Sequence, residues 1–209
     1  MHHPRLLRRT IFAIALAWPA LSLCAETTTP ATDTDIESVA GQLLVAAPGM
    51  PDDRFAGTVV LIVRQDKDGA FGIVINRPVE DHTVAELLDS IGETDKSVEG
   101  SVRIFAGGPV QPSVGFVLHS DEYQQKATLP VAKGIALTSS PSILRDIGHH
   151  QGPKKVLVAF GYAGWGPGQL EREMALHAWA TTTADPALVF DEEPSRVWDL
   201  AWARRSISL

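Results

Sequence analysis

The chain has 209 residues, of which 44% are hydrophobic and 21% charged, and this composition and length fit one compact globular domain. Its formal net charge is −7. The first 25 residues contain Arg5, Arg8 and Arg9 and no acidic residue, so the rest of the chain carries 15 basic and 25 acidic side chains, a net charge of −10. Nucleic-acid affinity depends largely on Lys and Arg that neutralise phosphates, so no nucleic-acid partner is expected.

Residues 1–25 have the basic, apolar and small-residue order of a secretory signal. The apolar run at 11–18 is shorter than the ~20 residues of a transmembrane helix, so no transmembrane anchor is expected after processing. We expect cleavage after Ala25, a flexible linker over residues 26–37, and a periplasmic or secreted protein. The alternatives are lipid modification of Cys24, or a mis-assigned start codon in front of a cytoplasmic protein.

Cys24 is the single cysteine, which excludes an internal disulfide and a Cys-based zinc site from the folded part.

Residues 38–209 are expected to form the folded domain. Three apolar, β-branched runs predict strands at residues 42–47, 57–64 and 70–76. The Asp68-Gly69 pair predicts a tight hairpin, so the second and third strands are expected to be antiparallel neighbours. Thr83 and Glu86 form a capping-box pattern before apolar residues at helical spacing, which predicts a helix that ends at Gly92.

Further apolar runs predict strands at residues 102–106, 114–119, 134–138 and 156–161, and the last of these is apolar enough to be central. A second helix is expected around Pro141, ending at Gly148, and a third from Gln169 to about Ala180. A last amphipathic stretch brings together Val197, Trp198, Ala201 and Trp202. Because strands cluster instead of alternating with helices, the pattern favours an α+β fold with a mixed, largely antiparallel sheet and flanking helices.

A glycine-rich turn joins the last predicted strand to the third helix, an order that also occurs in phosphate-binding loops. Here Pro167 has no N–H to donate, and Glu171 and Glu173 place negative charge in the first helical turns, so no nucleotide or other cofactor is expected. We interpret the turn as a tight reversal in which some glycines hold a positive φ and Tyr162 and Trp165 pack closely.

Catalytic motifs are weak in this sequence, which has no G-x-S-x-G and no H-E-x-x-H. His119 ends a predicted strand and could act as a general base with Glu171 or Glu173, although a lone histidine at such a position is more often a structural residue. The adjacent His149 and His150 lack a third ligand that the sequence can identify, so no metal site is expected.

Four separated segments stand out: PGMPDDRF at 48–55, DGAFGIVINRP at 68–78, FAGGPVQPSVGFVLH at 105–119 and VLVAFGYAGWGPGQLEREMALHAW at 156–179. Their order and spacing resemble the YqgE/AlgH family of bacterial proteins over roughly residues 38–209. The resemblance implies a compact domain with a strongly bent sheet and a cytosolic location without a signal peptide. It implies little chemistry, because the family is mostly uncharacterised; one branch is linked to transcriptional control of alginate production.

The favoured hypothesis is a non-catalytic binding or regulatory module for an unknown small molecule or protein partner. Three turns that each follow a predicted strand could converge on a ligand surface, whose candidate residues are Asn76, Arg77, Pro78, Gly107, Gly108, Pro109, Gly161, Tyr162, Gly164, Trp165 and Gln169. The alternatives are a hydrolase using His119 with a carboxylate, and a transcriptional regulator, which the acidic charge opposes.

Overall fold

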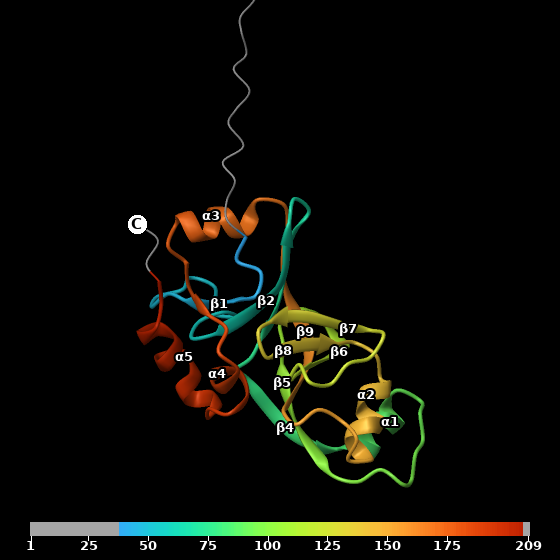
Figure 1. Cartoon of the computed structure of the whole chain (residues 1–209). Helices are drawn as coiled ribbons and strands as arrows, with labels where there is room; N and C mark the ends of the chain where they lie inside the picture. Colours follow the sequence, from blue (N-terminus) through green and yellow to red (C-terminus); the bar gives the residue numbers. More distant parts are fainter. Residues whose placement is uncertain (1–37, 207–209) are drawn as a thin grey trace, which may run out of the picture. The chain divides into compact units, whose positions relative to one another are not determined.

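The computed structural model describes residues 38–206. The predicted signal segment (1–25) and linker (26–37) lie outside the described residues, as do residues 207–209. The strands are β1 (Gln42–Ala46), β2 (Val59–Asp66), β3 (Gly69–Val74), β4 (Pro78–Thr83), β5 (Ser101–Ala106), β6 (Val110–His119), β7 (Thr128–Ala132), β8 (Ile135–Thr138), β9 (Val156–Trp165) and β10 (Trp179–Thr183). The helices are α1 (Val84–Ser90), α2 (Ser142–Gly148), α3 (Gln169–Ala175), α4 (Pro186–Phe190) and α5 (Pro194–Ala203) (Figure 1).

A single sheet of ten strands organises the fold. Its main path runs β10-β1-β2-β3-β9-β6-β8-β7, and β4 joins it through β5, which pairs with β9. The pairing of β5 with β9 is parallel, and the other pairings between these strands are antiparallel. The predicted α+β class with a mixed, largely antiparallel sheet is confirmed.

Strand β9 belongs to both halves of the sheet. Its first part, up to Tyr162, pairs with β5 and β6, whereas Ala163 to Trp165 pair with β3. Gly161 has a φ of 74°, in the left-handed region that favours glycine, and a Cβ there would lie 2.4 Å from the carbonyl oxygen of Gly108. Strand β9 therefore bends at Gly161, at a close approach to the segment that enters β6, and the sheet is strongly bent (Figure 1). The tight reversal predicted over residues 161–168 is wrong in its first part, because pairing with β3 extends the strand to Trp165.

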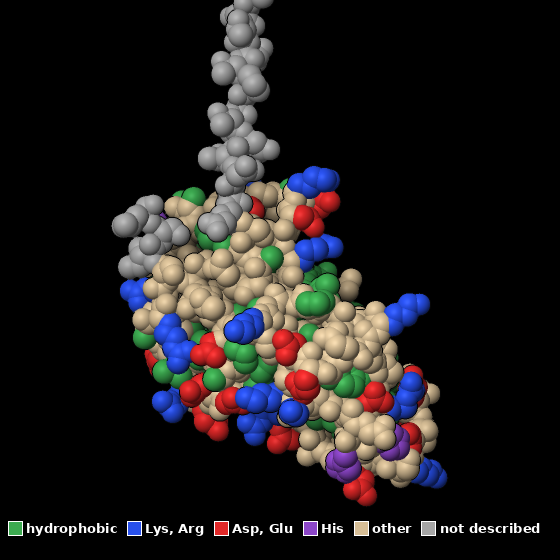
Figure 2. Space-filling model, in the orientation of Figure 1, with side chains coloured by type: hydrophobic (Ala, Val, Ile, Leu, Met, Phe, Trp, Pro, Cys, Tyr) green, Lys and Arg blue, Asp and Glu red, His purple; other side chains and the backbone are tan. Residues whose placement is uncertain are grey.

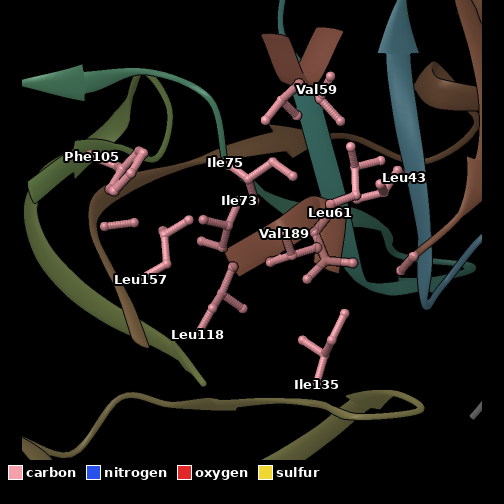
Figure 3. Packing of buried hydrophobic residues seen from close by; sticks show 14 of the residues in the cluster. Leu43, Val59, Leu61, Ile73, Ile75, Phe105, Leu118, Ile135, Leu157 and Val189 are labelled. Carbon is pink, nitrogen blue, oxygen red and sulfur yellow. The ribbon is translucent and has the colours of Figure 1, made fainter. Parts of the chain in front are cut away.

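Buried apolar side chains form three clusters on the faces of this sheet. One cluster lies between the sheet and helices α4 and α5, and contains the fully buried Leu61, Ile73 and Leu118 (Figure 3). Burying a side chain of this size stabilises the fold by about 1.5–3 kcal/mol. A second cluster includes Leu170 of α3, and a third includes residues of α1 and α2. The helices therefore cover separate parts of the sheet.

Local sequence signals predicted several elements correctly. Thr83 caps α1 through a capping box, in which its hydroxyl oxygen accepts from the Glu86 N–H at 3.2 Å while its own N–H donates to the Glu86 carboxylate at 2.9 Å. The β2–β3 hairpin turns at Lys67 and Asp68, and Gly69, whose φ is 128°, is the first residue of β3. Strand β9 is central, as expected, and α5 buries Val197 and Ala201.

The third helix was predicted too long. Helix α3 ends at Ala175, and His177 adopts a left-handed φ of 57° that stops helical propagation. Trp179–Thr183 then forms β10, which pairs with β1. An aromatic residue followed by threonines suits a strand once a partner is present, so tertiary pairing overrides the helical spacing. Strands β4 and β7 and helix α4 were also not predicted.

The surface of residues 38–206 mixes charges of both signs. Figure 2 shows Lys and Arg side chains interspersed with Asp and Glu on the face that it draws, so they form no uniform basic surface there. None of the helices in this part of the chain combines the length and the apolar character that a membrane span requires.

Candidate functional site

A cleft of about 500 Å³ opens between the loop after β1 and helix α3. We call it the Trp cleft, and its lining residues come from three segments: residues 47–55, Pro109 with Val110, and residues 164–179. Four candidates from the sequence line it, namely Pro109, Gly164, Trp165 and Gln169. The turn after β5, the end of β9 and the start of α3 therefore meet at one site.

The carboxylate of Glu173 organises the wall of the cleft that α3 provides. Its Oε2 accepts from the indole N–H of Trp165 at 2.9 Å and from that of Trp179 at 2.8 Å. Its Oε1 accepts from the side-chain amide of Gln169 at 2.9 Å, and the Gln169 carbonyl oxygen accepts from the Gly166 N–H at 3.1 Å. Three donors therefore fix this carboxylate, and the two indoles tie α3 to the end of β9 and the start of β10.

Three aromatic rings pack together beneath the cleft. Phe55 stacks on Trp165 with ring centroids 6.2 Å apart and meets the edge of Trp179 at 5.6 Å. Trp165 and Trp179 contact each other edge to face at 5.9 Å, and only 6% and 5% of their surfaces are exposed. Such pairs add about 0.5–1.5 kcal/mol each beyond their burial, so the cleft has a rigid aromatic floor.

Several lining residues were not predicted as site residues. Met50, Phe55, Leu176 and Trp179 line the cleft beside the predicted ones. Phe55 belongs to the segment PGMPDDRF, which stands out in the sequence only through the family resemblance, and the sequence predicts a helix at Trp179. No local spacing rule relates residue 55 to residue 179, since they meet only through the packing of the bent sheet.

Asn76 and Arg77 support the loop that lines the cleft. The Asn76 amide donates to the carbonyl oxygen of Gly57 at 2.9 Å, and its own oxygen accepts from the first N–H of β2 at 2.9 Å. The Arg77 guanidinium donates to the carbonyl oxygens of Arg54 and Ala56, the latter at 3.1 Å. These two predicted residues thus hold the loop from behind and do not line the cleft, and neither does the exposed Pro78.

Charged side chains lie at the rim. The Arg54 guanidinium bonds to the Asp52 carboxylate with Nη2 and Oδ2 2.7 Å apart, and it lies 6.0 Å above the ring of Phe55. The hydrogen bond from Arg54 lowers the pKa of Asp52, so this carboxyl stays ionised. His177 is exposed and also lines the cleft. The rim thus offers charges of both signs to a ligand.

The remaining glycine candidates serve the fold behind the cleft. A Cβ on Gly107 would lie 2.4 Å from the Gly161 carbonyl oxygen, and one on Gly108 would lie 2.1 Å from the carbonyl carbon of Tyr162. The Tyr162 ring packs against Phe71 at 4.9 Å, in a different apolar cluster from Trp165. These residues therefore permit the close crossing of two backbone segments and do not line the Trp cleft.

His119 is fully buried at the end of β6. Its Nδ1 lies 2.9 Å from the Ser120 carbonyl oxygen, to which it donates, and its Nε2 accepts from the Thr138 hydroxyl at 2.9 Å. Burial lowers the pKa of His119, which keeps the ring neutral. His119 pairs with the start of β9, whereas Glu171 and Glu173 follow its end, so the length of β9 separates the histidine from both carboxylates.

His149 and His150 each face a different carboxylate. His149 Nε2 lies 3.0 Å from the Asp95 carboxylate, and His150 Nε2 lies 3.7 Å from the Glu99 carboxylate. Across residues 38–206, no group of three or more His, Asp or Glu side chains is arranged to hold a metal ion. These pairs join the end of α2 to the segment before β5.

A bent, largely antiparallel α+β sheet, with one strand shared between its halves and a cleft built on aromatic rings, defines the class of this protein. The chain belongs to the AlgH-like family, whose sequence profile matches residues 43–209. It is 45% identical over 167 residues to a UPF0301 protein of Sphingopyxis alaskensis, covering 80% of this chain and 89% of that protein. It is 43% identical over 178 residues to a UPF0301 protein of Caulobacter vibrioides, covering 84% and 91%.

Solved structures have the same fold. The solution structure of the AlgH protein from Pseudomonas aeruginosa is similar, with a TM-score of 0.69 and 37% identity over 83% of this chain and 92% of that chain. A crystal structure of the protein DIP2367 from Corynebacterium diphtheriae, 22% identical with a TM-score of 0.64 over 82% of this chain and 89% of that one, shares the fold. The family resemblance noted from the sequence is confirmed.

Proposed function

We propose that this chain is a non-catalytic binding module and that the Trp cleft is its ligand site. Four predicted residues support this proposal because they line the same cleft: Pro109, Gly164, Trp165 and Gln169. Two more, Asn76 and Arg77, hold the loop that forms its other wall. Concave sites with apolar walls and a few fixed polar groups are typical of ligand pockets. The separation of His119 from the carboxylates of α3 supports a binding role over a hydrolytic one.

The chemistry of the cleft favours a ligand with an apolar body and an N–H donor. Apolar side chains, including Leu176 with 80% of its surface exposed, offer contact to the body of the ligand. A carboxylate has about four lone-pair positions, and three positions on Glu173 are taken by protein donors. The remaining position can accept one donor from an amine carried by a small molecule or by a partner's side chain.

The test uses 2-phenylethylamine as a cationic probe and 2-phenylethanol as its neutral counterpart. We expect the amine to bind more tightly, by calorimetry, than the alcohol. The variant Leu176→Ser removes an exposed apolar wall and should weaken binding several-fold, whereas Leu129→Ser, an exposed leucine on β7 outside the cleft, is the matched control. Equal binding to wild type and Leu176→Ser, or no binding of either probe, would contradict the proposal.

A further inference from the structure

A second concave region lies beside α1, away from the Trp cleft. One hollow of about 570 Å³ is lined by residues of β4, β5 and α1, and a second of about 160 Å³ lies between α1, β6 and the start of α2. Leu87 and Phe160 line both hollows, so the two are adjacent. We call this region the α1 groove.

Exposed apolar side chains concentrate in the α1 groove. Among residues 38–206, five large hydrophobic side chains are exposed: Val79, Ile91, Val114, Leu129 and Leu176. Three of them, Val79 at 62%, Ile91 at 45% and Val114 at 37%, line the groove. Exposed apolar side chains that gather in one region of a protein surface are typical of an interaction site, because leaving them in water is unfavourable.

The charges that line the groove are predominantly acidic. Glu80 and Glu86 line it together with His82, which lies 3.0 Å from the first carboxylate and 3.7 Å from the second. Neither hollow is lined by Lys or Arg. Two copies of this chain that met groove to groove would bring carboxylates together, and the whole chain has a formal charge of −7, so a second copy is a poor occupant.

We propose that the α1 groove binds a segment of a partner protein that presents a row of apolar side chains flanked by Lys or Arg. The apolar row would cover Val79, Ile91 and Val114, and the basic side chains would face Glu80 and Glu86. Amphipathic segments dock in apolar grooves in this way, with the apolar row supplying affinity and the flanking charges setting orientation.

The probe is a fluorescein-labelled amphipathic peptide of Leu and Lys, followed by anisotropy. Two matched peptides replace either Lys by Glu or Leu by Ser. The groove variant combines Val79→Ser, Ile91→Ser and Val114→Ser, and the control variant carries Leu129→Ser, an exposed leucine of β7 that lines neither the α1 groove nor the Trp cleft. All four positions are exposed, so both variants should fold, which thermal melts verify.

We expect wild type and the control variant to bind the Leu/Lys peptide equally and the groove variant to bind it roughly tenfold more weakly or not at all. The Leu/Glu and Ser/Lys peptides should bind more weakly to wild type. The proposal is overturned if both variants lose binding equally or if the groove variant binds like wild type. It is also overturned if wild type binds the Leu/Glu peptide as tightly as the Leu/Lys peptide, or does not bind the Leu/Lys peptide. Self-association of wild type that the groove variant abolishes overturns it in favour of a second copy.

Discussion

The indole N–H of Trp179 donates a 2.8 Å hydrogen bond to Oε2 of Glu173, and this bond joins β10 to α3. The same oxygen accepts from Trp165 at the end of β9. Removal of the carboxylate would leave two indole donors without partners in a nearly buried cluster. The stability of the Trp cleft thus depends on one side chain.

Glu173→Ala should therefore lower the free energy of unfolding by about 2–5 kcal/mol, because each unsatisfied buried donor costs about 1–3 kcal/mol. Urea unfolding measures the change. Glu171→Ala is the matched control on the same helix: its carboxylate accepts one hydrogen bond, from Gln65, and its loss should cost less than about 1 kcal/mol. Similar losses in both variants would show that Glu173 does not hold the cleft together.

The crossing of Gly161 and Gly108 gives a second prediction. Gly161→Ala should destabilise the fold by more than the ~1 kcal/mol of an ordinary change, since φ is 74° and the new Cβ would lie 2.4 Å from a carbonyl oxygen. Gly164→Ala is the milder control, because Gly164 has no positive φ and its nearest contact is the Tyr162 ring at 3.2 Å. Thermal melts that rank Gly164→Ala as the more damaging change would refute this account of the bend.

His119 should make stability depend on pH in a defined direction. Burial lowers its pKa below the ordinary value of 6.5, so the unfolded chain binds a proton more readily than the native one. The neutral His119 ring therefore contributes to the free energy of unfolding in full above the pKa of the unfolded chain. That contribution is lost as the pH falls from the unfolded pKa toward the lower folded pKa. Unfolding free energies measured from about pH 7 to pH 5 should fall more steeply for wild type than for His119→Gln. Parallel pH profiles would contradict the prediction.

Export remains a prediction from the sequence, because residues 1–37 lie outside the described structure. Expression in a Gram-negative host should give a mature chain that begins at Glu26, since residues 1–25 have the order of a secretory signal. Intact-mass measurement on periplasmic and cytosolic fractions checks this. A full-length chain found only in the cytosol would support the cytoplasmic alternative.

Features encoded by neighbouring residues were predicted from the sequence. The capping box of Thr83 and Glu86 and the hairpin at Gly69 need only local backbone geometry, and both are present. Strands β4 and β10 depend on partners far along the chain, β5 and β1, so their own residues carry little periodic signal.

The residues of the Trp cleft likewise include some that the sequence predicted and some that it could not predict. Unusual backbone chemistry pointed to Pro109 and Gly164, which line the Trp cleft. The contact between Phe55 and Trp179 spans most of the domain and has no sequence signature. The role of Glu173 as the acceptor for two tryptophans was likewise not predictable, since the sequence suggested only helix-end charge or catalysis.

Ligand binding in the Trp cleft can be followed on the indole N–H signals of a ¹⁵N-labelled protein. Trp165 and Trp179 donate to Glu173 at the cleft, whereas Trp198 donates to the Ala46 carbonyl oxygen and serves as an internal control. Titration with 2-phenylethylamine should shift the signals of Trp165 and Trp179 in a saturable manner and leave that of Trp198 in place. Unchanged cleft signals, or equal shifts of all three, would contradict the account.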